Sequence, residues 1–219
     1  VGAYLLTNFQ NTISYNDAVK ILCTTNAKNL DKLVKGKSIT GQELFSYIIP
    51  DKINTIKKKG DNIFFQIKNG NLVKGTLEKS QLSTKKNSII HYVWDKYGPT
   101  ETSDFIDNSQ HLILEYLLLK GMTIGFKDTI VSKETDDIIK ELIRNKVLSS
   151  HYQLTQVEND DNKLSAELTE ELMKAELNSI SSDTGRIILD SVPADNNFSI
   201  FIKSGSKGSP INVAQISGC

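Results

Sequence analysis

Five residues near the C-terminal end, Gly205-Ser206-Lys207-Gly208-Ser209, are the first group whose types could do chemistry. Glycines let a backbone approach a ligand closely, and a lysine among them can reach a phosphate. A phosphate-binding P-loop needs the spacing Gly-x-x-x-x-Gly-Lys-Ser/Thr directly after a strand. Here Ser206 precedes the lysine and Gly208 follows it, so the spacing predicts a flexible turn and not a nucleotide-hydrolysing loop.

The other side chains of catalytic type show no spacing typical of a known active site or metal site. His91, His111 and His151 are far apart in the sequence and lack metal-ligand spacing. No Gly-x-Ser-x-Gly elbow occurs, so serine hydrolase chemistry has no support. Cys23 and Cys219 are too few for a disulfide framework, which predicts free thiols in a reducing compartment.

Length and composition narrow the class of protein. A chain of 219 residues with 38% hydrophobic residues is large enough for one big domain or two small ones. Its formal net charge of zero excludes a free-standing polybasic nucleic-acid binder but allows a locally basic face. The longest apolar stretch, Leu112 to Leu119, is interrupted by Glu115 and is far short of the ~20 residues of a membrane span, so we expect no membrane partner.

Charge is nevertheless unevenly placed along the chain. Residues 51–86 contain nine lysines against three acids, whereas residues 134–183 contain twelve acids against five bases. Such asymmetry favours one part that faces phosphate and another that faces solvent or a basic neighbour. Two ordinary solvated faces would produce the same pattern.

The elements that would position these groups begin with two short helices and a hairpin. Ser14-Tyr-Asn-Asp17 and Thr40-Gly-Gln-Glu43 are capping-box patterns, and the second predicts a helix that runs until Pro50. Asn69-Gly70 lies between two strand-like runs, which predicts a β-hairpin near residues 62–78.

The rest of the chain reads as helical. Gly98-Pro99 and Thr100 predict the start of a helix that Gly121 ends. Further helices are expected over residues 133–148 and about 165–180, with a polar loop at 153–162 between them, and a looser, partly helical tail after Asp183-Thr-Gly185. The predicted fold class is α+β, with a strand-containing domain over residues 1–121 and a mainly helical domain over residues 122–219.

A series of strings, in fixed order, resembles the largest subunit of multi-subunit DNA-directed RNA polymerases, in its pore and funnel region. The matching strings are Gly2–Thr7; Thr40–Ser46 with Ile49-Pro50; Gly70-Asn-Leu72 with Gly75 and Lys79; Ile90–Trp94, Gly98-Pro99, Thr102, Phe105, Asp107-Asn108 and Gln110; Leu117-Leu118, Gly121, Ile124-Gly125 and Asp128-Thr129-Ile130; Leu177-Asn178 and Gly185; and Ser204–Ser209, Ile211–Val213 and Gln215. The resemblance spans nearly the whole chain.

This resemblance implies a fragment of a nucleotidyltransferase that lacks the catalytic aspartates. It implies a pore domain followed by a funnel domain that line the secondary channel, through which nucleoside triphosphates enter and backtracked RNA leaves. By position, Lys79 and Lys207 are similar to family lysines near the incoming triphosphate, and Gly205, Ser206, Gly208 and Ser209 complete that stretch. The resemblance further implies Mg²⁺ held by residues outside this segment.

The implied partners are the other polymerase subunits, the DNA template, the RNA transcript, nucleoside triphosphates and a transcript-cleavage factor. Ser80 stands where the family frequently has a second lysine, and Ser181 where its funnel helix has arginine. These departures suggest a divergent lineage such as a large DNA virus or a protist, and hence the nucleus, a virion or a viral factory in the cytoplasm. The alternative is a non-catalytic docking module whose acidic helices hold a cleavage or regulatory factor.

Overall fold

A computed structural model describes residues 1–8, 11–27, 30–158 and 163–218. The chain forms two compact units, which are described separately. The first comprises Val1–Thr123 with Lys203–Ser206, and the second comprises Ile124–Ile202 with Lys207–Cys219.

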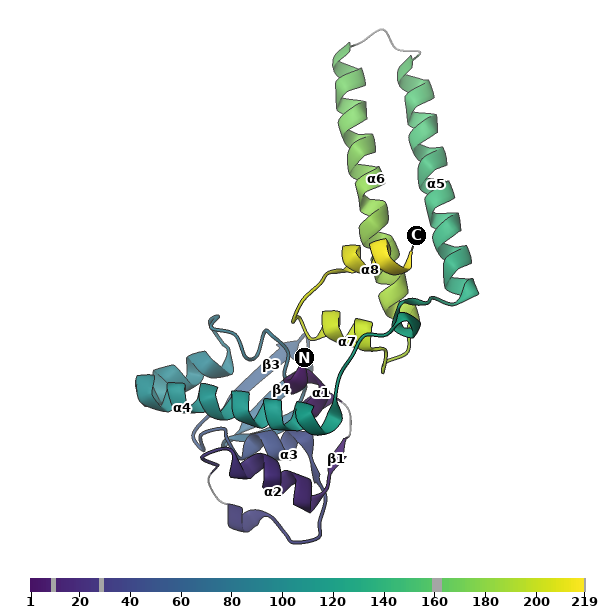
Figure 1. The fold of residues 1–219 in the computed structure, drawn as a ribbon. Helices are drawn as coiled ribbons and strands as arrows, with labels where there is room; N and C mark the ends of the chain where they lie inside the picture. The colour runs from purple at the N-terminus through teal and green to yellow at the C-terminus, as the bar shows by residue number, and fades with distance from the viewer. Residues whose placement is uncertain (9–10, 28–29, 159–162, 219) are drawn as a thin grey trace. The chain divides into compact units, whose positions relative to one another are not determined.

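The first unit combines helices with two small antiparallel sheets (Figure 1). Its elements in chain order are α1 (Gly2–Asn8), β1 (Thr12–Ile13), α2 (Tyr15–Cys23), η1 (Leu30–Lys32), β2 (Ile39–Thr40), α3 (Gly41–Ser46), β3 (Thr55–Lys59), β4 (Asn62–Lys68), β5 (Asn71–Lys74) and α4 (Ile89–Lys120). Strand β1 pairs with β2, and β3, β4 and β5 follow one another in the second sheet.

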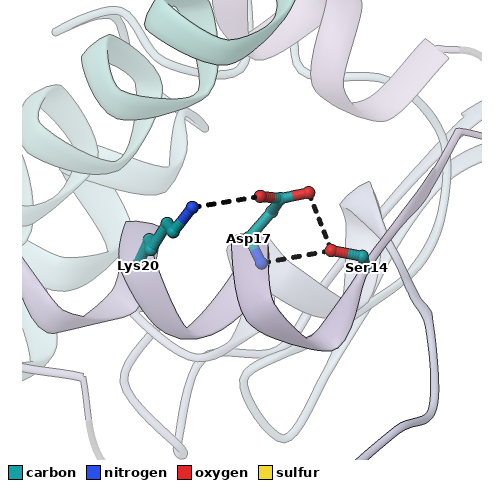
Figure 2. Close-up of polar contacts among 3 residues, drawn as sticks. All are labelled: Ser14, Asp17 and Lys20. Carbon is teal, nitrogen blue, oxygen red and sulfur yellow. Dashed lines mark hydrogen bonds and ion pairs between the residues drawn. The ribbon is translucent and has the colours of Figure 1, made fainter.

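Both predicted helix starts are confirmed. The Ser14 Oγ accepts a hydrogen bond from the Asp17 N–H (3.2 Å), and the Asp17 carboxylate accepts from the Ser14 hydroxyl and faces Lys20 at 3.9 Å (Figure 2). At α3, the Thr40 Oγ1 accepts from the Glu43 N–H while Glu43 Oε2 accepts from the Thr40 N–H, a complete capping box. Helix α3 ends at Ser46, four residues before Pro50, because only 3₁₀-type bonds continue through Ile48 and Ile49.

The hairpin predicted around Asn69-Gly70 is confirmed as β4 and β5. Asn69 and Gly70 have φ values of 48° and 75°, the positive pair that a tight two-residue hairpin turn requires. Strand β3 was not expected from the sequence, because its Thr-Ile-Lys-Lys-Lys composition is poor in strand-forming residues. It is held by its register against β4, in which Thr55 pairs with Ile67 and Lys57 with Phe65.

The helix predicted to begin at Gly98-Pro99 and Thr100 is confirmed, but a further helical stretch, which was not predicted, precedes it within α4. The chain is already helical from Ile89, because the Ser88 Oγ accepts from the His91 N–H (3.1 Å) and caps the helix. Gly98, with φ 81° and ψ −169°, breaks the helix internally and Pro99 restarts it. Its end at Gly121 is as predicted.

The core of the first unit lies between α4, the sheet and the short helices. Its fully buried members include Leu6, Ile21, Leu22, Leu44, Phe45, Ile53, Phe65, Ile67, Leu77, Ile89 and Leu112. Phe45 meets Phe105 of α4 edge to face, with ring centroids 6.4 Å apart. The core therefore fixes the segment that leaves β5, which carries Leu77.

The second unit is helical and consists of η2 (Phe126–Thr129), α5 (Lys133–Glu158), α6 (Lys163–Ser191), α7 (Asn197–Lys203) and α8 (Pro210–Ser217). Helices α5 and α6 run side by side (Figure 1), and Lys146 of α5 lies 4.0 Å from Glu176 of α6. Both are longer than predicted. Residues 153–158 continue α5 where a loop was expected, residues 159–162 of that loop lie outside the described residues, and Asp183 to Gly185 lie inside α6.

Two sets of contacts join the helices of this unit. Ile139, Ile188, Leu189 and Val213 form its buried cluster, which joins α5, α6 and α8. The Asp128 carboxylate accepts hydrogen bonds from the N–H groups of Gly125 (2.8 Å) and Asn197 (3.2 Å), which ties η2 to the start of α7. The partly helical tail is as predicted.

The α+β fold class is confirmed. Within the part of the chain that the structure describes, no helix combines the length and apolar content that crossing a bilayer demands.

Candidate functional site

The segment that follows β5 and leads to Lys79 is anchored to α1. The Leu77 N–H donates to the Thr7 Oγ1 (2.8 Å), and the Thr7 hydroxyl donates in turn to the Ala3 carbonyl (2.8 Å). All of these groups are buried, so the bonds have no competition from water. The backbone two residues before Lys79 is therefore fixed to α1.

A buried glutamine closes the turn around Lys79. The Gln81 Oε1 accepts from the Glu78 N–H (3.0 Å) and from the Ser80 hydroxyl (2.8 Å), and the Gln81 carbonyl accepts from the Ile89 N–H (2.8 Å). Ser80 is thus engaged in holding the turn. Sequence reasoning missed Gln81, because an isolated glutamine in a polar stretch carries no signal of burial.

The structure brings Lys79 together with Ser204, Gly205 and Ser206 in the first unit. The Lys79 N–H donates to the carbonyl of buried Ser204 (3.0 Å). A Cβ placed on Gly205 would lie 3.0 Å from the Lys79 Cβ, so Gly205 lies against the Lys79 side chain. The Lys79 side chain is exposed and makes no ion pair with any residue that the structure describes. Its backbone is held while its amino group stays available to an anion.

Lys207, Gly208 and Ser209 lie in the second unit, at the start of α8. The Ser209 N–H donates to the Asn212 Oδ1 (2.8 Å), which fixes the first turn of the helix, and Pro210 occupies its first position. Lys207 and Gly208 are exposed. Helix α7, which ends at Lys203, leads into this stretch, whereas a P-loop follows a strand.

One partly buried carboxylate lies near Lys79. Burial raises the pKa of Glu78, and a hydrogen bond with Thr76 and the charge of Lys57 oppose that shift. Burial lowers the pKa of Lys57, which the Glu78 charge partly offsets. The opposite charges of Glu78 and Lys57 thus act on each other's pKa, and Lys79 is the exposed charged side chain of this turn.

A cavity of about 910 Å³ lies elsewhere in the first unit and contains none of the six predicted site residues. Its polar lining carries both signs of charge: Lys32, Lys37, Lys52, Glu43, Asp51, Glu101 and Asp104. Its lining comes from separate stretches between residues 26 and 108, which no local motif reveals. Because the charges are mixed, the cavity does not select phosphate, and we place the candidate site at Lys79.

Among the residues described, no three His, Cys, Asp or Glu side chains lie close enough together to hold a metal ion. Around Lys79, the described residues offer one amino group and a glycine-containing turn, which can attract and contact a phosphate.

Comparison with known proteins assigns the family. The family model described as RNA polymerase Rpb1, domain 3, matches residues 1–129, and that of RNA polymerase Rpb1, domain 4, matches residues 132–219. The chain belongs to the RNA polymerase Rpb1 family.

Named relatives agree with this assignment. DNA-directed RNA polymerase subunit 1 of Acanthamoeba polyphaga mimivirus is 34% identical over the whole chain, which covers 14% of that protein. Subunit Rpo1N of the Methanothermobacter thermautotrophicus polymerase is 22% identical, again over the whole chain and 27% of that protein. DNA-directed RNA polymerase II subunit RPB1-B of Trypanosoma brucei brucei is 27% identical over 81% of the chain and 11% of that protein. The chain therefore spans a small part of the relatives it matches.

Proposed function

We propose that this chain is part of the catalytic largest subunit of a DNA-directed RNA polymerase, a nucleotidyltransferase that carries out DNA-templated transcription. Within that enzyme, residues 1–121 form the pore domain and residues 122–219 the funnel domain, and both line the channel for nucleotide entry and backtracked RNA. Family membership supports the first statement. The observation that carries the second is Lys79, whose N–H is bonded to Ser204 while its side chain stays exposed.

Lys79 and Lys207 attract the incoming triphosphate, and Gly205, Ser206, Gly208 and Ser209 let it pass close to the backbone. A lysine suits this task because its compact charge attracts phosphate without the bidentate grip of arginine. Enclosed basic walls raise the local concentration of anions and so speed their arrival. These residues attract and position the nucleoside triphosphate. The chemical step belongs to Mg²⁺ and its ligands elsewhere in the whole enzyme.

The same proposal names the partners. They are the other polymerase subunits, the DNA template, the RNA transcript, nucleoside triphosphates and a transcript-cleavage factor. The compartment is the nucleus, or a virion or viral factory, and the mimivirus relative at 34% identity favours the viral setting.

Lys207→Ala in the assembled polymerase is expected to raise the apparent KM for nucleoside triphosphates roughly two- to fivefold, with kcat nearly unchanged. The reason is that one exposed charge contributes up to about 1 kcal/mol to attraction of a phosphate. Steady-state nucleotide addition measures both constants. Lys127→Ala, which removes another exposed lysine of the same unit, is the control. An unchanged KM together with unchanged transcript cleavage would contradict the proposal.

A second candidate function is a docking surface for a transcript-cleavage or regulatory factor on α5 and α6. Glu134, Asp137, Glu141, Glu167 and Glu171 make no ion pair with residues that the structure describes. Large apolar side chains, including Ile138, Leu168 and Leu172, are exposed beside them. Acidic and apolar groups together suit a basic, amphipathic partner.

Glu167→Lys with Glu171→Lys is expected to weaken binding of a cleavage factor to the polymerase at least tenfold, because like charges across an interface repel. Pull-down at constant salt measures it, with Asp61→Lys and Asp107→Lys in the first unit as the matched charge reversal. Binding that survives the reversal on α6 would exclude this docking role.

A further inference from the structure

The outer face of the three-stranded sheet has a composition that the channel role does not use. Strands β3, β4 and β5 contain five lysines and no acidic residue. One of them, Lys57, lies on the inner face, with its Nζ 5.7 Å from the centre of the Phe65 ring. The other four are exposed: Lys58, Lys59, Lys68 and Lys74.

Strand register places apolar side chains among these lysines. Ile56 pairs with Gln66, and Gln66 pairs with Lys74, so one outward row crosses all three strands. Phe64 lies at the bulge of β4, where the register shifts opposite Lys57 and Lys58, and it is 47% exposed. Lys68 follows Phe64 by four residues and therefore shares its face.

The lysines on this face are unneutralised, and the sheet beneath them is rigid. Lys58, Lys68 and Lys74, which lie on this face, form no ion pair with a residue in the described ranges. The hairpin turn is fixed because the Asn69 N–H donates to the Asn54 Oδ1 (2.8 Å) and the Gly70 N–H to the Ile53 carbonyl (3.0 Å). A binding surface of this kind needs little ordering when a ligand arrives.

We infer that this face binds single-stranded RNA, with a base stacked on Phe64 and phosphates bound by Lys58, Lys68 and Lys74. Lysines that track a backbone and an exposed aromatic ring that accepts any base are the two parts of a sequence-tolerant single-strand site. A duplex buries its bases, so it would use the lysines and not the ring. An acidic protein segment would likewise use the lysines and not the ring.

The choice of RNA over single-stranded DNA rests on the proposed function, since a transcribing enzyme releases single-stranded RNA. Base stacking on Phe64 is inferred from the sheet alone and does not depend on the proposed function. Loss of the Lys207 effect on KM would therefore refute the channel role without touching binding to the sheet.

Phe64→Ala in the full chain is expected to weaken binding of an oligouridylate of about 12 nucleotides roughly tenfold, the effect of removing one stacked base. Fluorescence anisotropy with labelled RNA measures it. Phe64→Tyr keeps an aromatic ring and restores affinity, whereas Phe126→Ala removes a more exposed phenylalanine of the second unit and changes nothing.

Lys68→Gln with Lys74→Gln is expected to reduce the slope of log K against log salt concentration by about 1.4, because each phosphate contact on a single strand contributes about 0.7. Lys85→Gln with Lys86→Gln makes the same change of net charge off the sheet and leaves the slope unaltered. Full affinity in Phe64→Ala, equal binding of duplex RNA, tighter binding of oligothymidylate DNA, or equal competition by oligoglutamate would each overturn the inference.

Discussion

Gly185→Ala is expected to separate α8 from α6 and to destabilise the second unit by at least about 3 kcal/mol. A Cβ at this position would lie 1.9 Å from the Pro210 carbonyl oxygen and 2.4 Å from its carbon. Both atoms belong to backbone, so no side-chain rotation can relieve the overlap. Since Val213 of α8 belongs to the buried cluster with Ile188, displacement of α8 also opens the core.

Chemical denaturation followed by circular dichroism measures this loss, and hydrogen exchange over residues 210–217 localises it. Gly125→Ala is the matched control in the same unit, because its Cβ would meet only Asp128 Oδ2 at 3.8 Å. An unfolding midpoint equal to that of Gly125→Ala would show that α8 is not packed on Gly185 as the structure has it.

Local signals predicted those elements whose ends are set by local bonds. The caps at Ser14 and Thr40 and the Asn69-Gly70 turn each involve residues within four positions of one another, so the sequence contains the whole interaction. Strand β3 and the extended helix α6 depend on partners distant in sequence. Three successive lysines become a strand only because β4 lies beside them, and Asp183 to Gly185 stay helical where α8 packs on them.

The sequence likewise revealed some residues of the candidate site and not others. The Gly205-containing stretch was found from its residue types and Lys79 through resemblance, but their contact through Ser204 could not be predicted, because 125 positions separate the two bonded residues. Gln81 and Thr7 were missed because their importance is burial of a hydrogen bond, which residue type does not reveal. The lysine excess over residues 51–86 was visible, but only the register separates inward Lys57 from its exposed neighbours.

Gly75→Ala is expected to destabilise the first unit by roughly 2–4 kcal/mol and to release the turn that carries Lys79. Gly75 has a φ of 101°, where a side chain is strained, and its Cβ would lie 2.6 Å from the Phe64 carbonyl oxygen and 2.8 Å from the Phe65 ring. The Gly75 carbonyl also accepts from the Gln42 side chain (2.9 Å). Moving this residue pulls on the Leu77–Thr7 bond that anchors the segment.

Gly60→Ala distinguishes the strain of a positive φ from the steric overlap with β4. Gly60 also has a positive φ, 61°, but a Cβ there would meet nothing within 4 Å, so this variant carries only the conformational cost of about 1–2 kcal/mol. The excess loss in Gly75→Ala then measures the close approach to β4, and hydrogen exchange at the Leu77 amide reports whether its bond to Thr7 has opened. Equal losses in the two variants, with the Leu77 amide still protected, would mean that β4 does not hold the turn of Lys79 in place.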